Sequence, residues 1–438
     1  MSEFKKSVGF VSLGCDKNRV DTEYVISVLS TYDCFSFVAD KTKADIIIIN
    51  TCAFLASARN EASSVINEMS RLKHHPKIIV MGCLPMYKRE GLEKTFPAVS
   101  AFITPQDYQN IASIVFKLFN QPTIDISKNY TRRLTTPMHY AYLKIADGCN
   151  NRCAFCKIPY IRGNYKSVPK KALVAEAKSL CEKGVKEVIL VAQDVTRYGQ
   201  DIGENLVDLI QELSRIKKLT WIRLLYCYPD AVSEELVQEI KNNPKLLPYI
   251  DIPLQHISDN VLKKMYRRSR KSEIIALINH LRKEVSSIVI RSTFMVGFPG
   301  ETQQDFKELC DFLKEYKLDN VGFFKYSREE GTPSYNFEGQ IDEKEKDKRL
   351  KTVQTLQEKI ASENNKKLVG KTFKVITDGY DRNHHFYIGR SYREAPDIDF
   401  EVLFTSPYPL EMGSFNDVDI LDYDKGYFIG QVDKRTTY

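Results

Sequence analysis

The sequence lacks the features that would place the chain in a membrane or export it. None of its apolar runs approaches the roughly 20 residues of a membrane-spanning helix. The N-terminus, MSEFKKSVGFVSLGC, has no secretory apolar stretch and no cleavage site of small residues. Internal repeats and low-complexity segments are also absent. We therefore expect a cytoplasmic globular protein with no membrane partner, in which a content of ten cysteines argues for metal binding or catalysis rather than disulfides.

Length and charge predict several domains of different character. A chain of 438 residues exceeds one ordinary domain, so two or three are expected. The net charge is +7, yet the segment from Lys367 onward carries nine basic and twelve acidic residues, a net charge of −3. The last part of the chain is therefore acidic, whereas the part before it is basic.

The first segment alternates apolar runs with longer helical runs, which predicts a parallel sheet. The expected strands and helices are Val8–Leu13, Asn18–Leu29, Ile46–Ile49, Phe54–Leu72 and Ile78–Met81. Cys15, Cys52 and Cys83 each follow one of the three strands. Because open α/β sheets bind ligands beyond the carboxyl ends of their strands, we expect these three loops to converge on one site.

After a polar linker, expected over Asn120–Pro137, strands alternate with helices again. The six expected strands are Ala141–Ile145, Glu187–Ala192, Trp221–Leu225, Tyr249–Ile252, Ile288–Val296 and Asn320–Phe324. The helices between and after them are Leu173–Lys183, Leu206–Lys217, Glu234–Asn242, Asp259–Arg267, Ser272–Glu284 and Thr302–Glu315. About six βα units predict an open or partial (β/α)6 TIM-like barrel rather than the closed barrel of eight.

A charged amphipathic helix, Ile341–Lys367, leads into a segment of short alternating β runs. Five strands are expected in it, at Thr372–Thr377, Phe386–Arg390, Phe400–Phe404, Asp417–Asp422 and Tyr427–Val432. Five short strands in about seventy residues predict a small β-barrel. The predicted fold is thus α/β with three domains, at residues 5–119, 135–366 and 367–438.

Three closely spaced cysteines, Cys149, Cys153 and Cys156, lie just after the first strand of the central segment. A structural zinc site needs four ligands, but no further cysteine lies nearby and the nearest histidine is His139. A zinc ion with three cysteines and a water stays an alternative. A 4Fe–4S cluster on three thiolates fits better, because one iron then stays open to another ligand.

The C-x-x-x-C-x-x-C spacing of this triplet resembles that of the radical S-adenosylmethionine enzymes. The resemblance implies that the open iron binds the amino and carboxylate groups of S-adenosylmethionine. The reduced cluster would then pass one electron to the sulfonium, giving a deoxyadenosyl radical that abstracts hydrogen from carbon.

Cys15, Cys52 and Cys83 alone would be weak evidence, since buried cysteines near strand ends are common. With their contexts GCDKNRVD, NTCAF and GCL, and with the compact triplet, they closely resemble the methylthiotransferase family. The resemblance implies a second 4Fe–4S cluster on these three residues, which handles the sulfur. It also implies that the C-terminal barrel is a TRAM domain engaging the substrate. Both clusters must then face one cavity, with the N-terminal domain capping the partial barrel.

Two branches of this family compete, one modifying an adenosine of tRNA and the other an aspartate of a protein. GCDKNRVD, QDVTRYG at Gln193–Gly199, LLYCYPD at Leu224–Asp230 and FFKYSREEGT at Phe323–Thr332 are similar to the protein branch, whereas DIPLQH at Asp251–His256 is largely shared. An acidic C-terminal domain also suits a basic protein better than tRNA, whose phosphates favour a basic surface. One departure is Phe400, where relatives usually have glycine.

The protein branch implies a methylthio group placed on the β-carbon of an aspartate in the twelfth small-subunit ribosomal protein. One S-adenosylmethionine supplies the radical and another supplies the methyl group. A reductant protein and a sulfur source are implied as further partners, and tRNA modification stays the alternative.

Five other residues are candidates for contact with S-adenosylmethionine. Gln193 and Asp194 end a strand and could bind its ribose, while Gly297, Gly300 and Glu301 form a strand-to-helix turn. A plain tight turn explains the latter three equally well.

Overall fold

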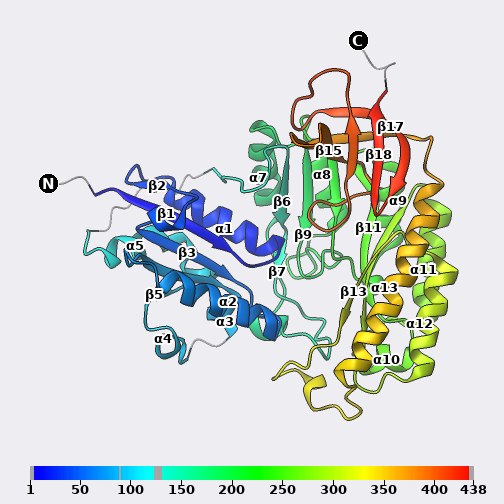
Figure 1. Cartoon of the computed structure of the whole chain (residues 1–438), viewed down its shortest axis with the longest axis horizontal. Coiled ribbons are helices and arrows are strands. Elements are labelled where there is room, and N and C mark those ends of the chain that lie inside the picture. Colours follow the sequence, from blue (N-terminus) through cyan, green and yellow to red (C-terminus); the bar gives the residue numbers. More distant parts are fainter. Residues whose placement is uncertain (1–3, 88–89, 123–130, 434–438) are drawn as a thin grey trace.

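Three large sheets organise the chain in the computed structural model, which describes residues 4–87, 90–122 and 131–433 (Figure 1). An N-terminal parallel sheet lies beside a central parallel sheet, and a small closed barrel lies across one end of the central sheet. This is the mixed α/β architecture that the sequence predicts. The middle of the expected linker, residues 123–130, lies outside the described part of the chain.

The N-terminal sheet has five parallel strands in the order β2-β1-β3-β4-β5. Their bounds are β1 Lys6–Ser12, β2 Phe35–Phe37, β3 Ile46–Thr51, β4 Lys77–Gly82 and β5 Val99–Phe102. Helices α1 (Asp16–Leu29), α2 (Ala56–Ser70) and α5 (Ile111–Leu118) cover it. The isoleucines of β3 are fully buried and alternate between two cores, Ile46 and Ile48 in one and Ile47 and Ile49 in the other. Burial on both faces explains why this strand is an unbroken apolar run.

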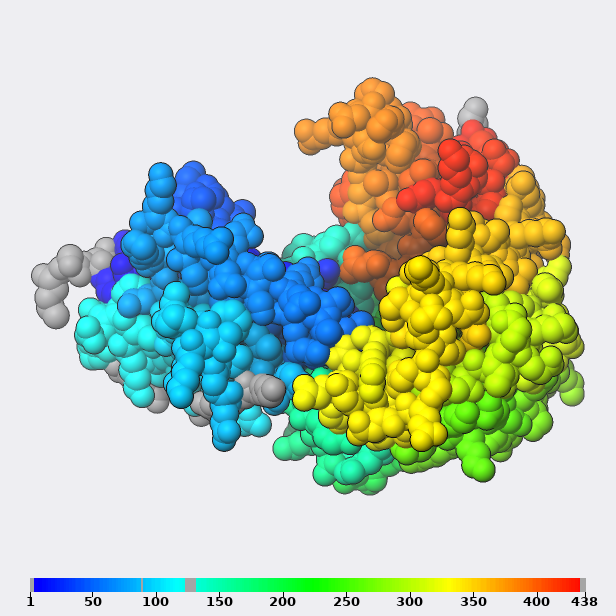
Figure 2. Space-filling model, turned by 60° about the horizontal axis from the view of Figure 1, so that its bottom comes forward, coloured from blue at the N-terminus to red at the C-terminus, as the bar shows by residue number. Residues whose placement is uncertain are grey.

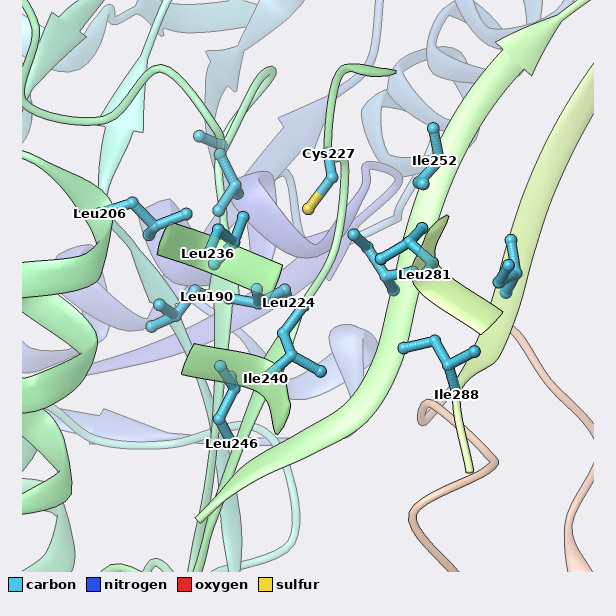
Figure 3. Close-up of a cluster of buried hydrophobic side chains, with 14 of the residues drawn as sticks. Leu190, Leu206, Leu224, Cys227, Leu236, Ile240, Leu246, Ile252, Leu281 and Ile288 are labelled. Atoms are coloured by element: carbon cyan, nitrogen blue, oxygen red, sulfur yellow. The ribbon is translucent and has the colours of Figure 1, made fainter. Parts of the chain in front are cut away.

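The central sheet has six parallel strands in chain order, β6-β9-β10-β11-β12-β13, and is open. Their bounds are β6 Tyr140–Lys144, β9 Glu187–Val191, β10 Trp221–Leu224, β11 Leu246–Gln255, β12 Val289–Val296 and β13 Asn320–Lys325. The longer helices between and after them are α7 Lys170–Glu182, α8 Leu206–Ser214, α9 Glu234–Asn242, α10 Asp259–Lys264, α11 Lys271–Glu284, α12 Gln303–Tyr316 and α13 Glu343–Lys366. Leu190 and Leu224 on the strands meet Leu236, Ile240 and other helix residues in one continuous core (Figure 3).

The C-terminal barrel closes in the order β14-β15-β16-β18-β17. Its strands are β14 Thr372–Asp381, β15 Phe386–Arg390, β16 Val402–Thr405, β17 Phe415–Asp424 and β18 Tyr427–Val432. It packs on the amino ends of the central strands, where the rings of Trp221 and Phe415 lie 4.7 Å apart. Glu187, at the start of β9, accepts hydrogen bonds from Arg223 at 2.8 Å and from Arg390 of the barrel at 2.6 Å. The barrel therefore covers the end of the sheet opposite to the cysteine loops.

Several predicted boundaries are wrong by a few residues. The helix expected from Phe54 begins at Ala56, and the one expected to end at Arg267 ends at Lys264. The strand expected from Phe400 begins at Val402, while the Phe400 ring packs against Tyr427 at 5.2 Å. Strands β2 and β5 were not expected, because runs of three or four residues give too short a pattern. In the described ranges, no helix has both the length and the apolar character of a membrane span.

Candidate active site

All six cysteines of the two triplets line one cavity of about 370 Å³. The cavity lies between the N-terminal unit and the carboxyl ends of the central strands. Cys15, Cys52 and Cys83 reach it from positions just after β1, β3 and β4. The prediction that both sets face one cavity is therefore confirmed, although their spacing along the chain could not place the two domains relative to each other.

The compact triplet lies on a loop that begins after the short strand β7 (Ala146–Asp147). Gly148 has a φ of +77°, and a Cβ there would lie 2.1 Å from the carbonyl oxygen of Asn164, so this turn requires glycine. The Cys153 Sγ lies 2.6 Å from the Tyr228 hydroxyl. The Cys156 Sγ accepts a hydrogen bond from the backbone N–H of Ile158 at 3.4 Å. The loop therefore holds its sulfur atoms among hydrogen-bonding groups.

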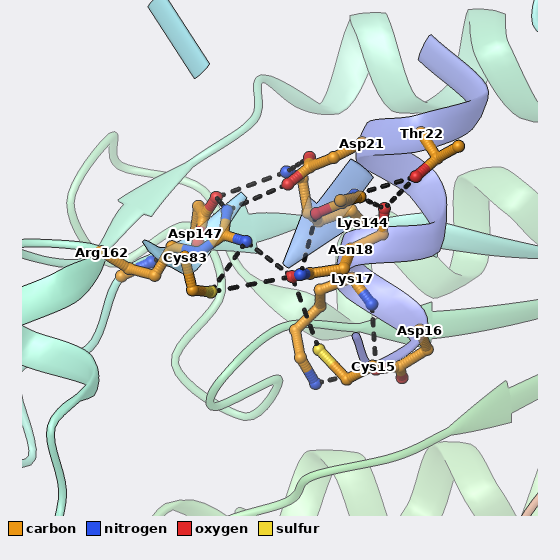
Figure 4. Close-up of polar contacts among 12 residues, drawn as sticks. Cys15, Asp16, Lys17, Asn18, Asp21, Thr22, Cys83, Lys144, Asp147 and Arg162 are labelled. Atoms are coloured by element: carbon orange, nitrogen blue, oxygen red, sulfur yellow. Dashed lines mark hydrogen bonds and ion pairs between the residues drawn. The ribbon is translucent and has the colours of Figure 1, made fainter. Parts of the chain in front are cut away.

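Two cysteines of the dispersed triplet lie at the starts of helices, and Cys52 directly follows β3. Cys15 is the N-cap of α1, and Cys83 begins the short helix α3 (Cys83–Tyr87). The side-chain oxygen of Asn18 lies 3.9 Å from the sulfur atoms of both Cys15 and Cys83. Figure 4 shows this asparagine between the two thiols, with Arg162 from the central unit beside it. The Asn18 side chain thus contacts both Cys15 and Cys83, which lie 68 residues apart in the chain.

The donor sets fit iron–sulfur clusters. Burial, with the neighbouring thiol of Cys153, raises the pKa of Cys149 to about 11, and burial also raises the pKa of Cys52 and Cys83. Such thiols lose their protons when a metal binds. Among the residues that the structure describes, no three His, Cys, Asp or Glu side chains form a ligand group for a single metal ion. A 4Fe–4S cluster needs no such group, since each thiolate binds a different iron.

Two glutamines in the cavity have polar atoms that need a partner. The side-chain oxygens of Gln193 and Gln255 are buried, and no described group donates a hydrogen bond to either. Gln255 ends β11 with a φ of +71°, next to a shift of strand register. A ligand that carries amino or hydroxyl groups would satisfy both oxygens. Sequence reasoning proposed Gln193 but missed Gln255, although the strand-ending DIPLQH segment contains it.

The other four candidates for the cofactor have different contacts and are not among the residues lining the cavity. Asp194 is fully buried and accepts hydrogen bonds from Asn151 and Thr196 at 2.7 and 2.6 Å. Glu301 accepts a hydrogen bond from the Gly297 N–H at 2.6 Å and pairs with Arg349 of α13 at 2.9 Å. Gly300 packs beside Lys264. The contacts of Gly297, Gly300 and Glu301 stabilise the turn between β12 and α12.

Glu329, on the segment after β13, binds the N-terminal unit at the edge of the cavity. Its side chain accepts a hydrogen bond from the Ala56 N–H at 2.7 Å and one from Arg59 at 2.8 Å. Lys157, next to the compact triplet, lies 3.6 Å away. Figure 2 shows this yellow segment against the blue N-terminal unit. The two cysteine sets are therefore held together by contacts that lie outside both triplets.

Three parts of the chain match known families. Residues 143–313 match the Radical SAM superfamily, residues 7–104 the Uncharacterized protein family UPF0004, and residues 369–432 the TRAM domain. The chain is 43% identical to the ribosomal protein uS12 methylthiotransferase RimO of Acetivibrio thermocellus, over 98% of each chain. It is 45% identical to the protein of the same name from Clostridium botulinum, over 96% of this chain and 97% of that relative.

Solved structures show the same architecture at low identity. The radical S-adenosylmethionine methyltransferase TsrM from Kitasatospora setae superposes with a TM-score of 0.55 at 15% identity, over 75% of this chain and 77% of its own. The cobalamin-dependent radical enzyme OxsB superposes with a TM-score of 0.52 at 12% identity, over 81% of this chain and 56% of its own. At these identities the likeness concerns the fold.

The family matches decide the class of enzyme. Membership in the Radical SAM superfamily makes S-adenosylmethionine and 4Fe–4S clusters the cofactors of this transferase. The relatives are aligned over nearly their whole length, so all three units of the fold are included. The chain therefore belongs to the RimO family of radical S-adenosylmethionine methylthiotransferases.

Proposed function

We propose that this chain adds a methylthio group to the β-carbon of an aspartate in ribosomal protein uS12. The observation that carries the proposal is the shared cavity, into which both cysteine triplets open. A reaction that needs both a carbon radical and a sulfur donor requires the two centres to face one substrate atom. Modification of a tRNA adenosine, the alternative raised by the sequence, has less support from the relatives, which are named for the ribosomal protein.

We assign Cys149, Cys153 and Cys156 to the cluster that binds S-adenosylmethionine, and Cys15, Cys52 and Cys83 to the auxiliary cluster. When bound, the first cluster supplies the electron that cleaves S-adenosylmethionine, and the second handles the sulfur. The chain would contribute three thiolates to each cluster, fewer than a complete set of four protein ligands. Gln193 and Gln255 offer acceptor oxygens to the cofactor, while the hydrogen bond from Ala56 to Glu329 holds α2 beside the cavity.

The charges around the cavity suit a substrate that carries a carboxylate. Lys17, Arg267 and Arg291 line it, whereas the charge of Arg162, which also lines it, is balanced by Asp21 and Asp147. The one carboxylate in the lining, Asp251, pairs with Arg291 at 2.8 Å. The Nζ of Lys17 lies 3.4 Å from the centroid of the Tyr226 ring and 3.0 Å from Asp16. An aspartate side chain entering this cavity would meet favourable charge, as would the carboxylate of S-adenosylmethionine.

The remaining assignments follow from the same function. The proposed domains are residues 5–119 for the auxiliary cluster, 135–366 for the radical core and 367–438 for the TRAM domain. The acidic C-terminal domain suits a basic ribosomal protein. A reductant protein and a sulfur source are needed as partners. None of the ten cysteines, all of which the structure describes, forms a disulfide, which suits the cytoplasm.

The deciding experiment is anaerobic. The reconstituted enzyme receives reductant, a sulfide source and S-adenosylmethionine, and is offered purified uS12 and tRNA in separate reactions that are read by mass spectrometry. A methylthio increment on one aspartate of uS12 is the expected result. The same increment on a tRNA adenosine would overturn the proposed substrate but keep the chemistry, and no increment on either, with both clusters intact, would count against the assignment.

A further inference from the structure

Arg162 connects the radical core to the auxiliary cysteine set, and nothing in the function proposed above uses it. It is the C-cap residue of the short helix α6 (Ile158–Ile161), just after the compact triplet. Its side chain is only 2% exposed and reaches into the N-terminal unit. There its Nη2 donates a hydrogen bond to the Asn18 side-chain oxygen at 2.7 Å and another to the Cys83 Sγ at 3.4 Å. Both contacts are visible in Figure 4.

The second terminal nitrogen of this guanidinium, Nη1, is held by two carboxylates. Arg162 Nη1 donates to Asp21 and to Asp147, both at 3.0 Å. Lys144 also pairs with both carboxylates, so two cations and two anions form a neutral group. The orientation of the guanidinium is therefore set before any metal binds. A thiolate at Cys83 would add one negative charge, and it would already face a fixed donor.

We propose that Arg162 is a positioning residue that donates a charged hydrogen bond to the cluster-bound Cys83 and raises the reduction potential of the auxiliary cluster. The proposal rests on the proposed assignment of Cys15, Cys52 and Cys83 to that cluster. Hydrogen bonds and positive charge at a cluster sulfur stabilise the reduced state, which carries one more negative charge. Because Arg162 belongs to the radical core, the auxiliary cluster has its working potential only when the two domains are docked.

The competing interpretation is that Arg162 only holds the domains together through Asp21. A purely structural role predicts lower stability when the residue is changed, but an unchanged potential in any molecule that keeps its cluster. The chain also supplies a matched control. Arg267 Nη1 lies 3.7 Å from the Cys153 Sγ, in the other triplet. A change of Arg267 should therefore affect the radical-core cluster and leave the auxiliary cluster alone.

The experiment uses the full chain with Cys149, Cys153 and Cys156 changed to alanine, so that only the auxiliary cluster assembles. After anaerobic reconstitution, iron content is measured, and the cluster is titrated with dithionite and mediator dyes while electron paramagnetic resonance records the reduced signal. We expect Arg162→Gln to shift the midpoint potential to a more negative value. Arg162→Lys keeps a cation for Asp21 but loses the planar fork, so its shift should be smaller and of the same sign. Arg267→Gln in this background should leave the potential unchanged.

The outcomes separate the inference from the function on which it rests. If the parent with the three alanines binds no cluster, the assignment of Cys15, Cys52 and Cys83 fails, and the inference fails with it. If the cluster assembles and Arg162→Gln titrates like the parent, the inference alone is wrong and Arg162 is structural. If Arg162→Gln does not hold a cluster, Arg162→Lys decides: an unchanged midpoint potential overturns the proposal, and a more negative one supports it.

Discussion

Changing Glu329 to glutamine should uncouple cleavage of S-adenosylmethionine from transfer of sulfur. Glu329 is 1% exposed and lies between Arg59 of α2 and Lys157 of the triplet loop. The glutamine oxygen can still accept the hydrogen bond from Ala56, so the cap of α2 survives while the negative charge is lost. The change therefore acts on the docking of the N-terminal domain rather than on the fold of either domain.

The loss of docking free energy in Glu329→Gln can be estimated from the burial of the ion pair. Removing one partner of a buried ion pair costs about 3–5 kcal/mol. Because the Arg59 side chain is 22% exposed, water compensates part of this loss, and we expect about 2 kcal/mol. That free energy corresponds to a roughly 30-fold larger population of undocked molecules. In those molecules the compact triplet is intact but the auxiliary cysteines no longer face the same cavity.

Two assays measure this effect. Amide hydrogen exchange at the start of α2 should become roughly 30-fold faster, since its protection depends on docking. The ratio of deoxyadenosine formed to uS12 methylthiolated should rise, because cleavage needs only the radical core. Glu330→Gln, at the exposed neighbouring position, is the matched control and should change neither quantity. An unchanged ratio and unchanged exchange in Glu329→Gln would refute the docking argument.

Three further predictions concern the clusters, the cofactor and the barrel. Cys15→Ala should halve the iron content and abolish methylthio transfer while deoxyadenosine still forms; an equal loss of both products would contradict separate roles for the triplets. Gln255→Leu removes an unpaired acceptor from the cavity and should weaken binding of S-adenosylmethionine about tenfold, as measured by equilibrium dialysis; unchanged affinity would exclude Gln255 from the cofactor site. Burial alone would raise the pKa of Glu187, but Arg390 and Arg223 outweigh it and hold the pKa below the ordinary 4.5. A carboxyl group with a lowered pKa stabilises the folded state fully at pH values above its ordinary pKa. This stabilisation is lost as the pH falls from the ordinary pKa through the lowered one. The free energy of unfolding measured in urea should therefore decrease as the pH falls below 4.5. Glu187→Gln should lower this free energy by about 3 kcal/mol at neutral pH and remove its pH dependence. Parallel plots of unfolding free energy against pH for the two proteins would contradict the assignment.

The architecture could be predicted because its signals are local. Fully buried strands such as β3 are unbroken apolar runs, and the spacing of Cys149, Cys153 and Cys156 places three thiols on one loop whatever the rest of the chain does. The short strands β2 and β5 were missed, since three or four residues carry too little pattern. The boundary errors at Phe54, Arg267 and Phe400 arise where helix ends and strand ends are set by contacts with other elements.

The six cysteines that we propose as cluster ligands could be selected from the sequence, because each triplet follows apolar runs that predict strands and the compact triplet has a characteristic spacing. Tertiary structure alone decided that the sets share a cavity and what holds them there. The hydrogen bonds from Arg162 to Cys83 and from Ala56 to Glu329 span 79 and 273 residues of the chain. Contacts at such separations depend on how preformed sheets and helices pack against each other. No local pattern of residues records that packing.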